Sequence, residues 1–371
     1  MEPRFITISS AIFHLSLCVF CLISPSYALI PLILSASLFL GYEFILKPSL
    51  QRSDLISIGL FIAGIGQAYI FQDRLDLSVI LGSYYIFICY LFSNLRVIKH
   101  VRLDLLMIIF SISIFTNLID ATEQFGTIVR NALRFQAEMG SPIITASTIS
   151  CMSLFCAWFA GRNGWISISI VYLISGFIIV MLTGTRSFFF GWILIIVYTI
   201  YQHFFKELKY HSWFKVLMPV FVSTVLALFL ILFWNRLKSI FDFVSFDNAN
   251  RLHEWIENLI IITEQFPLGY GFASLSKFPE SLIQGFFTIN GESALLNIFS
   301  DLGVFGFMIL SFLLYRIATK IAISHIVTGR ILSFFILVFG SSYIFSWGLM
   351  HPVVMFLVVL SVSSIYYTDE L

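Results

Sequence analysis

The sequence predicts an all-α integral membrane protein, a polytopic transmembrane helical bundle of about 12 spans with 11 as the fallback count. Composition is the first reason: 59% of the 371 residues are hydrophobic and 11% are charged, whereas soluble domains carry roughly 25% charged residues. The mean hydropathy of +0.96 agrees with this class. The second reason is that apolar runs long enough to cross a hydrocarbon core of about 30 Å recur along the whole chain.

Twelve spans are predicted, and the last pair is the least certain. Gly348 and Pro352 interrupt one long apolar run there, so the pair can also be read as a single span. We place the spans near 5–23, 27–46, 54–71, 77–93, 103–119, 142–160, 165–182, 188–205, 214–234, 292–316, 331–347 and 351–367.

The distribution of Lys and Arg predicts the orientation, because short cytoplasmic loops retain these residues. With the N-terminus inside, thirteen of the 21 Lys and Arg residues are cytoplasmic and eight are outside. Setting aside two longer outside loops, 120–141 and 235–291, leaves only Arg74 and Arg186 outside. We therefore expect one membrane domain over 1–371, with both termini cytoplasmic and two longer loops on the outside.

Two features of the chain bear on processing and redox state. Arg4, an apolar stretch and Ser26-Tyr27-Ala28 resemble a cleavable signal peptide, although retention as a first helix is the favoured interpretation. All five cysteines fall in apolar runs, so neither a disulfide framework nor a zinc site is expected. The net charge of +1 and the absence of clustered Lys and Arg argue against nucleic acid as a partner.

The larger outside loop is predicted to contain an amphipathic helix. From Asn250, apolar residues recur at spacings of three and four, so that one stripe can face either the bundle or the lipid surface. We therefore expect a helix that lies across the outer membrane surface. Pro267 should end this helix, and Pro267-Leu-Gly-Tyr-Gly271 should form a turn. A second reversal at Asn290-Gly291 precedes Glu292 at the start of the next span.

Several motifs between about 130 and 310 resemble the O-antigen polymerase and ligase superfamily. They are an Arg before a Trp-containing helix, the Pro267-Leu-Gly-Tyr-Gly271 turn, Glu292 at a span start, and Asp301-Leu-Gly-Val-Phe-Gly306. Leu182-Thr-Gly-Thr-Arg186-Ser is similar to that family's Thr-Gly-Ser-Arg element, and Arg134 with Gly140 and Pro142 is a weaker match. Ligases of the superfamily usually have His where this chain has Glu292, so the chain looks more like the polymerases.

The resemblance implies a glycosyltransferase of the bacterial inner membrane, with the two longer outside loops in the periplasm. It would polymerise oligosaccharide repeat units carried on polyprenyl diphosphate, on the periplasmic side. Its donor and acceptor would both be lipid-linked, with membrane lipids and a chain-length regulator protein as candidate partners. An Arg fork suits the diphosphate leaving group, and Arg186 is the first candidate because its short loop has no other cation. Arg251, Arg134 and Arg130 are candidates for binding the lipid-linked glycan.

The acceptor hydroxyl needs a base, and Glu292 is the candidate for removing its proton. His351 and His253 are reserve bases, and Asp301 is expected to be structural within the bundle. No cofactor or metal is implied, because the outside face has no Asp-x-Asp pair and the chain has no Walker-type loop. The alternatives are an O-antigen ligase acting on a lipid core, and a flippase or transporter of lipid-linked oligosaccharide.

Overall fold

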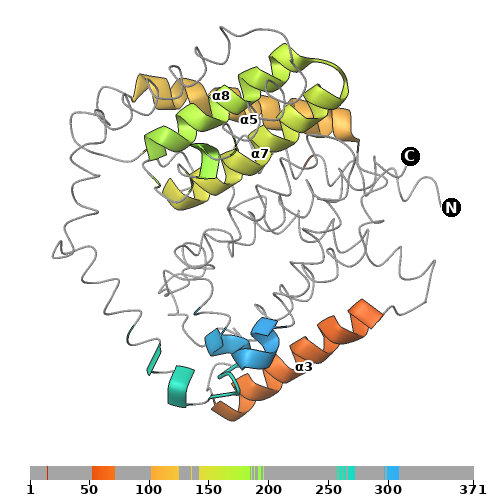
Figure 1. Ribbon diagram of the computed structural model, residues 1–371, viewed down its shortest axis with the longest axis vertical. Helices are drawn as coiled ribbons and strands as arrows, with labels where there is room; N and C mark the ends of the chain where they lie inside the picture. The colour runs from red at the N-terminus through yellow and green to blue at the C-terminus, as the bar shows by residue number, and fades with distance from the viewer. Residues whose placement is uncertain are drawn as a thin grey trace, which may run out of the picture.

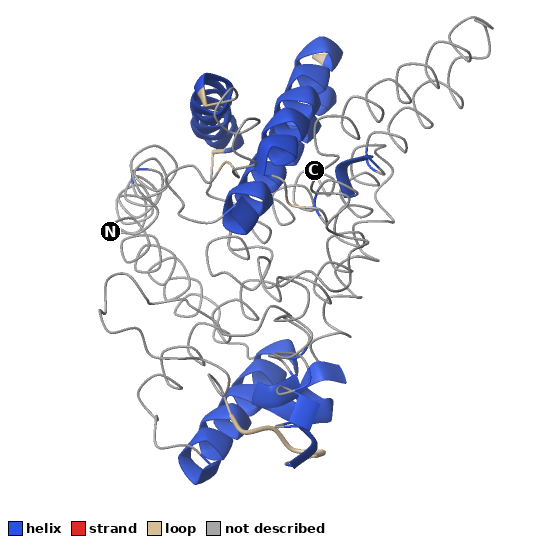
Figure 2. Cartoon of the chain, turned by 90° about the vertical axis from the view of Figure 1, so that its left-hand side faces the viewer, coloured by secondary structure: helices blue, strands red, loops and turns tan. Residues whose placement is uncertain are grey.

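A computed structural model shows helices and connecting turns, and no strand, in the part of the chain that it describes. The helices form two groups that lie at opposite ends of the view in Figure 1 and remain apart in Figure 2. The described residues are 15, 52–71, 102–124, 135, 142–183, 185, 188, 191–193, 195, 256, 259–260, 262–264, 266–271, 296 and 299–308.

Four complete helices coincide closely with predicted spans. They are α3 (Arg52–Phe71), α5 (Leu103–Glu123), α7 (Pro142–Arg162) and α8 (Ile166–Thr183). Two of them, α5 and α8, are long and apolar enough to cross a membrane. The all-helical prediction is therefore confirmed for the described residues.

The loop predicted over 120–141 begins later than expected, because α5 continues to Glu123. Ala121 is buried against the bundle, so the last turn of α5 still contributes to packing. The hydroxyl of Thr122 donates to the carbonyl of Ile119 at 2.8 Å, which keeps its polar group satisfied within the helix. The predicted span ended at 119 because Asp120 and Glu123 lower the mean hydropathy there. These two residues do not break the helix.

Helix α7 is the centre of its group and packs against both α5 and α8. Its buried side chains include polar ones, among them Thr145, Ser147, Thr148, Ser150 and Ser153. Small polar residues let helix backbones approach closely and can bond within the helix, as Ser147 does to the carbonyl of Ile143 at 2.7 Å. Aromatic packing closes the α5–α7 contact, where the rings of Phe110 and Phe155 lie edge to face at 5.4 Å.

The two flanking helices turn apolar side chains outward. On α5 the exposed residues Ile108, Ile112, Phe115 and Ile119 recur at helical spacing and form one stripe. Helix α8 exposes a comparable set that includes Ile166, Ile170 and Ile174. Such stripes on helices of spanning length are typical of surfaces that face lipid.

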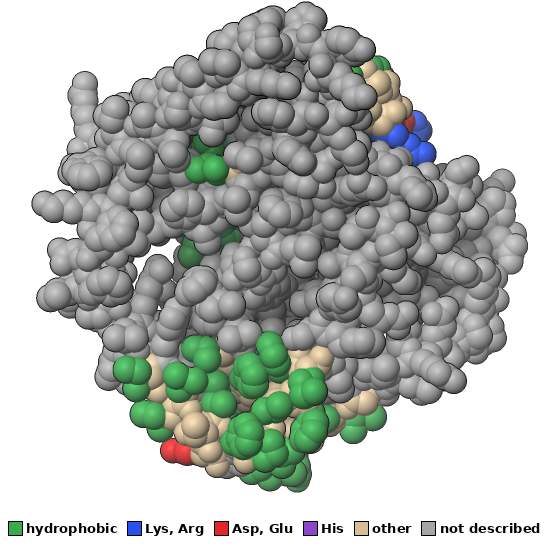
Figure 3. Space-filling model, viewed as in Figure 1, with side chains coloured by type: hydrophobic (Ala, Val, Ile, Leu, Met, Phe, Trp, Pro, Cys, Tyr) green, Lys and Arg blue, Asp and Glu red, His purple; other side chains and the backbone are tan. Residues whose placement is uncertain are grey.

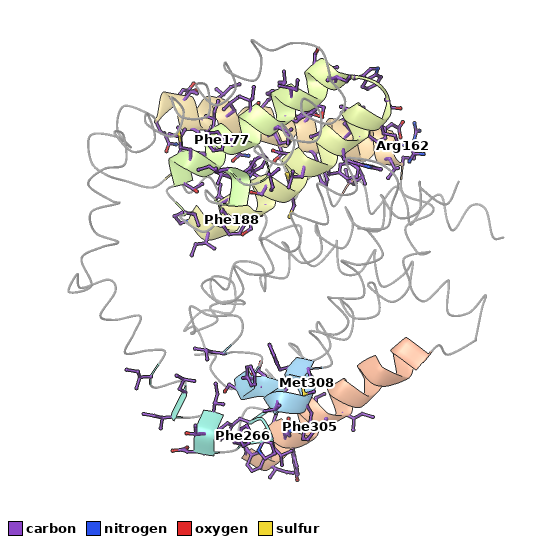
Figure 4. The ribbon with its side chains drawn as sticks, viewed as in Figure 1. Arg162, Phe177, Phe188, Phe266, Phe305 and Met308 are labelled. Atoms are coloured by element: carbon purple, nitrogen blue, oxygen red, sulfur yellow. The ribbon has the colours of Figure 1, made fainter. Side chains whose placement is uncertain are left out.

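The second group combines α3 with two short apolar segments. One is the helix Phe299–Met308, and the other is a helical stretch seen at 256, 259–260 and 262–264, followed by a turn at Phe266. The prediction that the loop helix ends before Pro267 is therefore confirmed. Figure 4 shows Phe266, Phe305 and Met308 together in this group, and Arg162 and Phe188 in the other.

Several predictions concern residues outside the described part of the chain. Cys151 and Cys156 are described, and both are buried free thiols, whereas Cys18, Cys21 and Cys89 are not described. The span predicted at 188–205 is helical at 188, 191–193 and 195, and the span at 5–23 is described only at Leu15, which is helical. The remaining predicted spans outside the description are 27–46, 77–93, 214–234, 331–347 and 351–367.

Candidate functional site

All of the site residues predicted from the sequence lie outside the described part of the chain. The structure does, however, describe residues directly next to several of them, and these residues build two hydrogen-bonded junctions. The predicted residues are Glu292, Arg186, Arg251, Arg134, Arg130, His351 and His253.

The first junction forms around the motif that ends α8, and we call it the threonine junction (Phe135, Pro142, Leu182, Thr183 and Thr185). The single proton of the Thr183 hydroxyl is shared between the carbonyl of Val180 at 2.7 Å and the hydroxyl oxygen of Thr185 at 3.0 Å. The backbone N–H of Thr185 returns to the Thr183 hydroxyl at 3.3 Å. This local pattern ends the helix with its polar groups paired, although both threonines are buried.

The threonine junction also joins three parts of the chain that are distant in sequence. The Thr185 hydroxyl donates to the carbonyl of Pro142, the first residue of α7, at 3.3 Å. The N–H of Phe135 donates to the carbonyl of Leu182 at 3.2 Å. The residue that follows Arg134 and the residue that precedes Arg186 therefore belong to the same bonded cluster.

The chain beyond the threonine junction is held against α7 by a buried tryptophan. The indole N–H of Trp192 donates to the hydroxyl of Ser150 at 2.7 Å. Gly176 of α8 permits this packing, because a Cβ there would lie 2.6 Å from Cβ of Ser153 and 2.9 Å from Cη2 of Trp192. Helices α7 and α8 and the segment from Phe188 onward thus meet at a small-residue contact.

The second junction joins the two glycine motifs found in the sequence, and we call it the glycine junction (Pro267–Gly271 with Ser300–Val304). The N–H groups of Tyr270 and Gly271 donate to the carbonyls of Ser300 and Asp301 at 2.7 and 2.9 Å. In return, the N–H of Val304 donates to the carbonyl of Pro267 at 3.1 Å. The two motifs are thus bonded to each other through their backbones.

The glycine junction interrupts the regular helical bonding around Gly303. In an unbroken α-helix the N–H of Val304 would donate to Ser300, but here it donates to Pro267. Gly303 has a φ of +68°, a conformation that residues with a Cβ rarely adopt. The turn therefore satisfies backbone groups that a broken helix within an apolar environment would otherwise leave unpaired.

Close backbone contact explains why both motifs need glycine. A Cβ on Gly269 would overlap the Asp301 carbonyl, and a Cβ on Gly303 would overlap the Pro267 carbonyl. Gly271 has a φ of +93°, and a Cβ there would overlap the backbone of Ala68 in α3. Replacing any of these glycines would therefore force the backbones apart.

Helix α3 packs directly against the glycine junction, a contact that the sequence did not predict. Gly271 rests against Gly64 and Ala68, and the rings of Phe71 and Tyr270 meet edge to face at 6.0 Å. Small residues four apart on one helix are a recognised signal for close packing. Gly64 and Ala68 have this spacing, but the spacing alone does not identify the segment that packs against them.

Asp301 lies within the glycine junction, and its place fits the structural role predicted for it. The residue is buried, and its main-chain carbonyl accepts the bond from Gly271. On the polar edge of the junction, the Tyr270 hydroxyl donates to the carboxylate of Glu264 at 2.9 Å. No group of three or more metal-ligating side chains occurs among the described residues.

A comparison with protein families gives a match that includes the glycine junction and the α8 side of the threonine junction. A family model described as O-antigen ligase matches residues 168–311. This match supports the resemblance of the chain to the O-antigen ligase and polymerase superfamily. A comparison with curated proteins finds no match to the chain.

The matched range begins within α8, includes the glycine junction, and ends just beyond Met308. Of the threonine junction it includes Leu182, Thr183 and Thr185, whereas Phe135 and Pro142 lie outside it. It includes Arg186, Arg251, His253 and Glu292, whereas Arg130, Arg134 and His351 lie outside it. Together with the apolar helices, the match indicates a membrane protein that acts in polysaccharide assembly.

Proposed function

We propose that the chain is a polymerase that joins oligosaccharide repeat units carried on polyprenyl diphosphate. The acceptor is the sugar hydroxyl of one lipid-linked unit, and the donor is the growing glycan on another. The reaction takes place on the periplasmic side of the inner membrane and requires no metal. We assign Glu292 and Arg186 to catalysis, and Arg251, Arg134 and Arg130 to binding of the lipid-linked glycan.

In the proposed reaction, the carboxylate of Glu292 takes the proton of the acceptor hydroxyl as its oxygen attacks the anomeric carbon of the donor. The bond between that carbon and the diphosphate oxygen breaks, and the lipid diphosphate leaves with the bonding electrons. The guanidinium of Arg186 stabilises the negative charge on the departing diphosphate. His351 and His253 are the alternative bases.

One observation carries the proposal: the glycine junction ties together the two ends of the segment that contains Glu292. Gly271 and Tyr270 precede this segment, Ser300 and Asp301 follow it, and these residues are bonded through their backbones. A site residue on a segment closed at both ends is held with less conformational freedom than one on an open loop. The range matched by the family model, residues 168–311, includes Glu292.

The test is Glu292→Gln in a strain that lacks the chromosomal copy, with the length profile of the surface glycan as the readout. Gln retains the shape and hydrogen bonding of Glu but accepts no proton, so polymer formation should fall by roughly 10²–10⁴. Glu264→Gln is the matched control, because Glu264 is an exposed carboxylate of the same loop. Full-length polymer from Glu292→Gln at normal membrane level would transfer the base role to His351 or His253.

A ligase is the second candidate, because the family model that matches carries the description O-antigen ligase. The glycan profile of a deletion strain separates the two activities. If single repeat units still reach their final anchor while long chains disappear, the chain is a polymerase. Loss of both single units and long chains from the anchor would favour the ligase.

A further inference from the structure

An apolar surface covers the outer side of the glycine junction and the chain segments around it, and we call it the apolar rim. Its members come from α3, from the loop helix and turn, and from the helix Phe299–Met308, and Figure 3 shows hydrophobic side chains gathered over this end of the molecule. The members, all large hydrophobic residues exposed by 48% or more, are Ile62, Tyr69, Ile70, Ile256, Leu259, Ile260, Phe266, Leu268, Phe305 and Met308.

The loop contributes half of the apolar rim. Ile256, Leu259 and Ile260 recur at helical spacing, so they lie on one face of the loop helix. The sequence left open whether this stripe faces the bundle or the lipid surface. The structure turns it outward, and the following turn exposes Phe266 by 67% and Leu268 by 51%.

The apolar rim is continuous with helices of the bundle, because the glycine junction attaches the turn to them. Val304 donates to Pro267 within the junction, and Phe305 directly follows Val304 with 63% of its surface exposed. On the other side, Gly271 rests on Ala68, and Tyr69 and Ile70 follow Ala68 on α3. The exposed side chains of the turn therefore extend a surface that already belongs to α3 and Phe299–Met308.

We propose that the apolar rim is inserted into the membrane interface, with lipid acyl chains as its partner, at the side where α3 ends at Phe71. An apolar surface of this extent is costly in water. In this chain, exposed apolar stripes of the same kind occupy the outer faces of α5 and α8, the helices of spanning length. The loop helix and its turn thus anchor the loop in the bilayer rather than project from it.

The polar edge of the apolar rim indicates how deep the insertion goes. Thr263 and Glu264 continue the exposed face of the loop helix after Ile260. The carboxylate of Glu264 accepts a hydrogen bond from the hydroxyl of Tyr270, whose ring contacts Phe71. A tyrosine with an apolar contact on its ring and a polar contact at its hydroxyl is typical of the headgroup level. Phe266 and Leu268 then lie on the acyl-chain side of that level.

The test uses a nitroxide label on single cysteines placed at Phe266 and Leu268 in a variant whose native cysteines are replaced by alanine. The protein is reconstituted in vesicles of phosphatidylethanolamine and phosphatidylglycerol, and power saturation compares relaxation by oxygen with relaxation by a water-soluble nickel chelate. Ile112→Cys on the α5 stripe is the lipid reference. Asn163→Cys, in the exposed polar turn between α7 and α8, is the aqueous reference.

Labels at 266 and 268 should relax with oxygen and be shielded from nickel, as the Ile112 reference is. Nickel access equal to that of the Asn163 reference would overturn the proposal. Shielding from both reagents, with spin–spin broadening between two copies, would assign the apolar rim to a dimer interface instead.

A second measurement covers the case in which the cysteine-free protein does not accumulate. A photoreactive benzoylphenylalanine at Phe266 in the otherwise native chain should form an adduct with the mass of a phospholipid. A cross-linked pair of chains, or the absence of a lipid adduct, would overturn the proposal.

Discussion

At the scale of single residues, the structure places the neighbours of two candidate arginines in one cluster. Phe135 follows Arg134 and Thr185 precedes Arg186, and both belong to the threonine junction. The hydroxyl groups of Thr183 and Thr185 are engaged in hydrogen bonds within this cluster. The motif therefore combines threonines with a structural role and an arginine to which we assign the chemistry.

The prediction at this scale concerns Arg186→Lys. Lysine preserves the charge but not the planar fork that binds two phosphate oxygens, so polymer yield should fall at least about tenfold. The measurement is the glycan length profile, normalised to the amount of protein in the membrane. Thr185→Ser is the matched control, because serine retains the hydroxyl that donates to Pro142. Near-normal polymer from Arg186→Lys would assign Arg186 to an interfacial role.

At the scale of helices and turns, glycine has different roles at different places in the group that contains α3. Gly271 meets the backbone of Ala68, whereas Gly59 and Gly66 of α3 have nothing within 4 Å of a built Cβ. The consequence of adding a methyl group should therefore depend on position and not on residue type. Helix propensity alone would favour alanine at the two helical positions.

The prediction at this scale compares Gly271→Ala with Gly66→Ala. The first variant forces the turn away from α3 at a positive φ, and should lose at least about 2 kcal/mol of stability. The second should be neutral or more stable by about 0.5–1 kcal/mol. Thermal unfolding of the purified protein in detergent measures both variants. Equal unfolding temperatures for the two would contradict the close contact at the glycine junction.

At the scale of the whole molecule, α7 is shielded on its sides while α5 and α8 present apolar stripes. A helix that is enclosed by protein can carry Ser and Thr, as Ser147 bonds to a carbonyl of α7 itself and Ser150 accepts the indole N–H of Trp192. Only α5 and α8 meet the length and hydropathy of a span among the described helices. Burial therefore explains why α7, although central, is less apolar than its neighbours.

The prediction at this scale is the orientation of the chain. With short cytoplasmic loops retaining Lys and Arg, Lys277 should react with a membrane-impermeant amine reagent in spheroplasts. Lys209 should react only after the membrane is opened. Each lysine is assigned by mass spectrometry of the labelled peptides, with the Lys277→Arg and Lys209→Arg variants as controls for each assignment. Protection of Lys277 in intact spheroplasts would reverse the orientation and remove Glu292 from the periplasmic face.

Local sequence was sufficient to locate the four complete helices in the described part of the chain, apart from the last turn of α5, and to locate one turn. The helices Leu103–Glu123 and Ile166–Thr183 follow from apolar runs of neighbouring residues. Pro267 ends the preceding helix because proline cannot continue one. The two glycine motifs were also visible in the sequence, one as a predicted turn and the other through the family resemblance, whereas the structure shows that backbone contact excludes a side chain there. These features depend on residues that are near one another in the chain.

Contacts between distant segments were decided only by the tertiary structure. Three such features depend on which surfaces fit together. They are the contact of Gly271 with Ala68, the hydrogen bond from Trp192 to Ser150, and the outward direction of Ile256 and Ile260. Periodicity shows that a stripe exists, but both lipid and a protein core accept an apolar stripe. The choice between them follows from close packing between segments far apart in sequence, which local pattern does not encode.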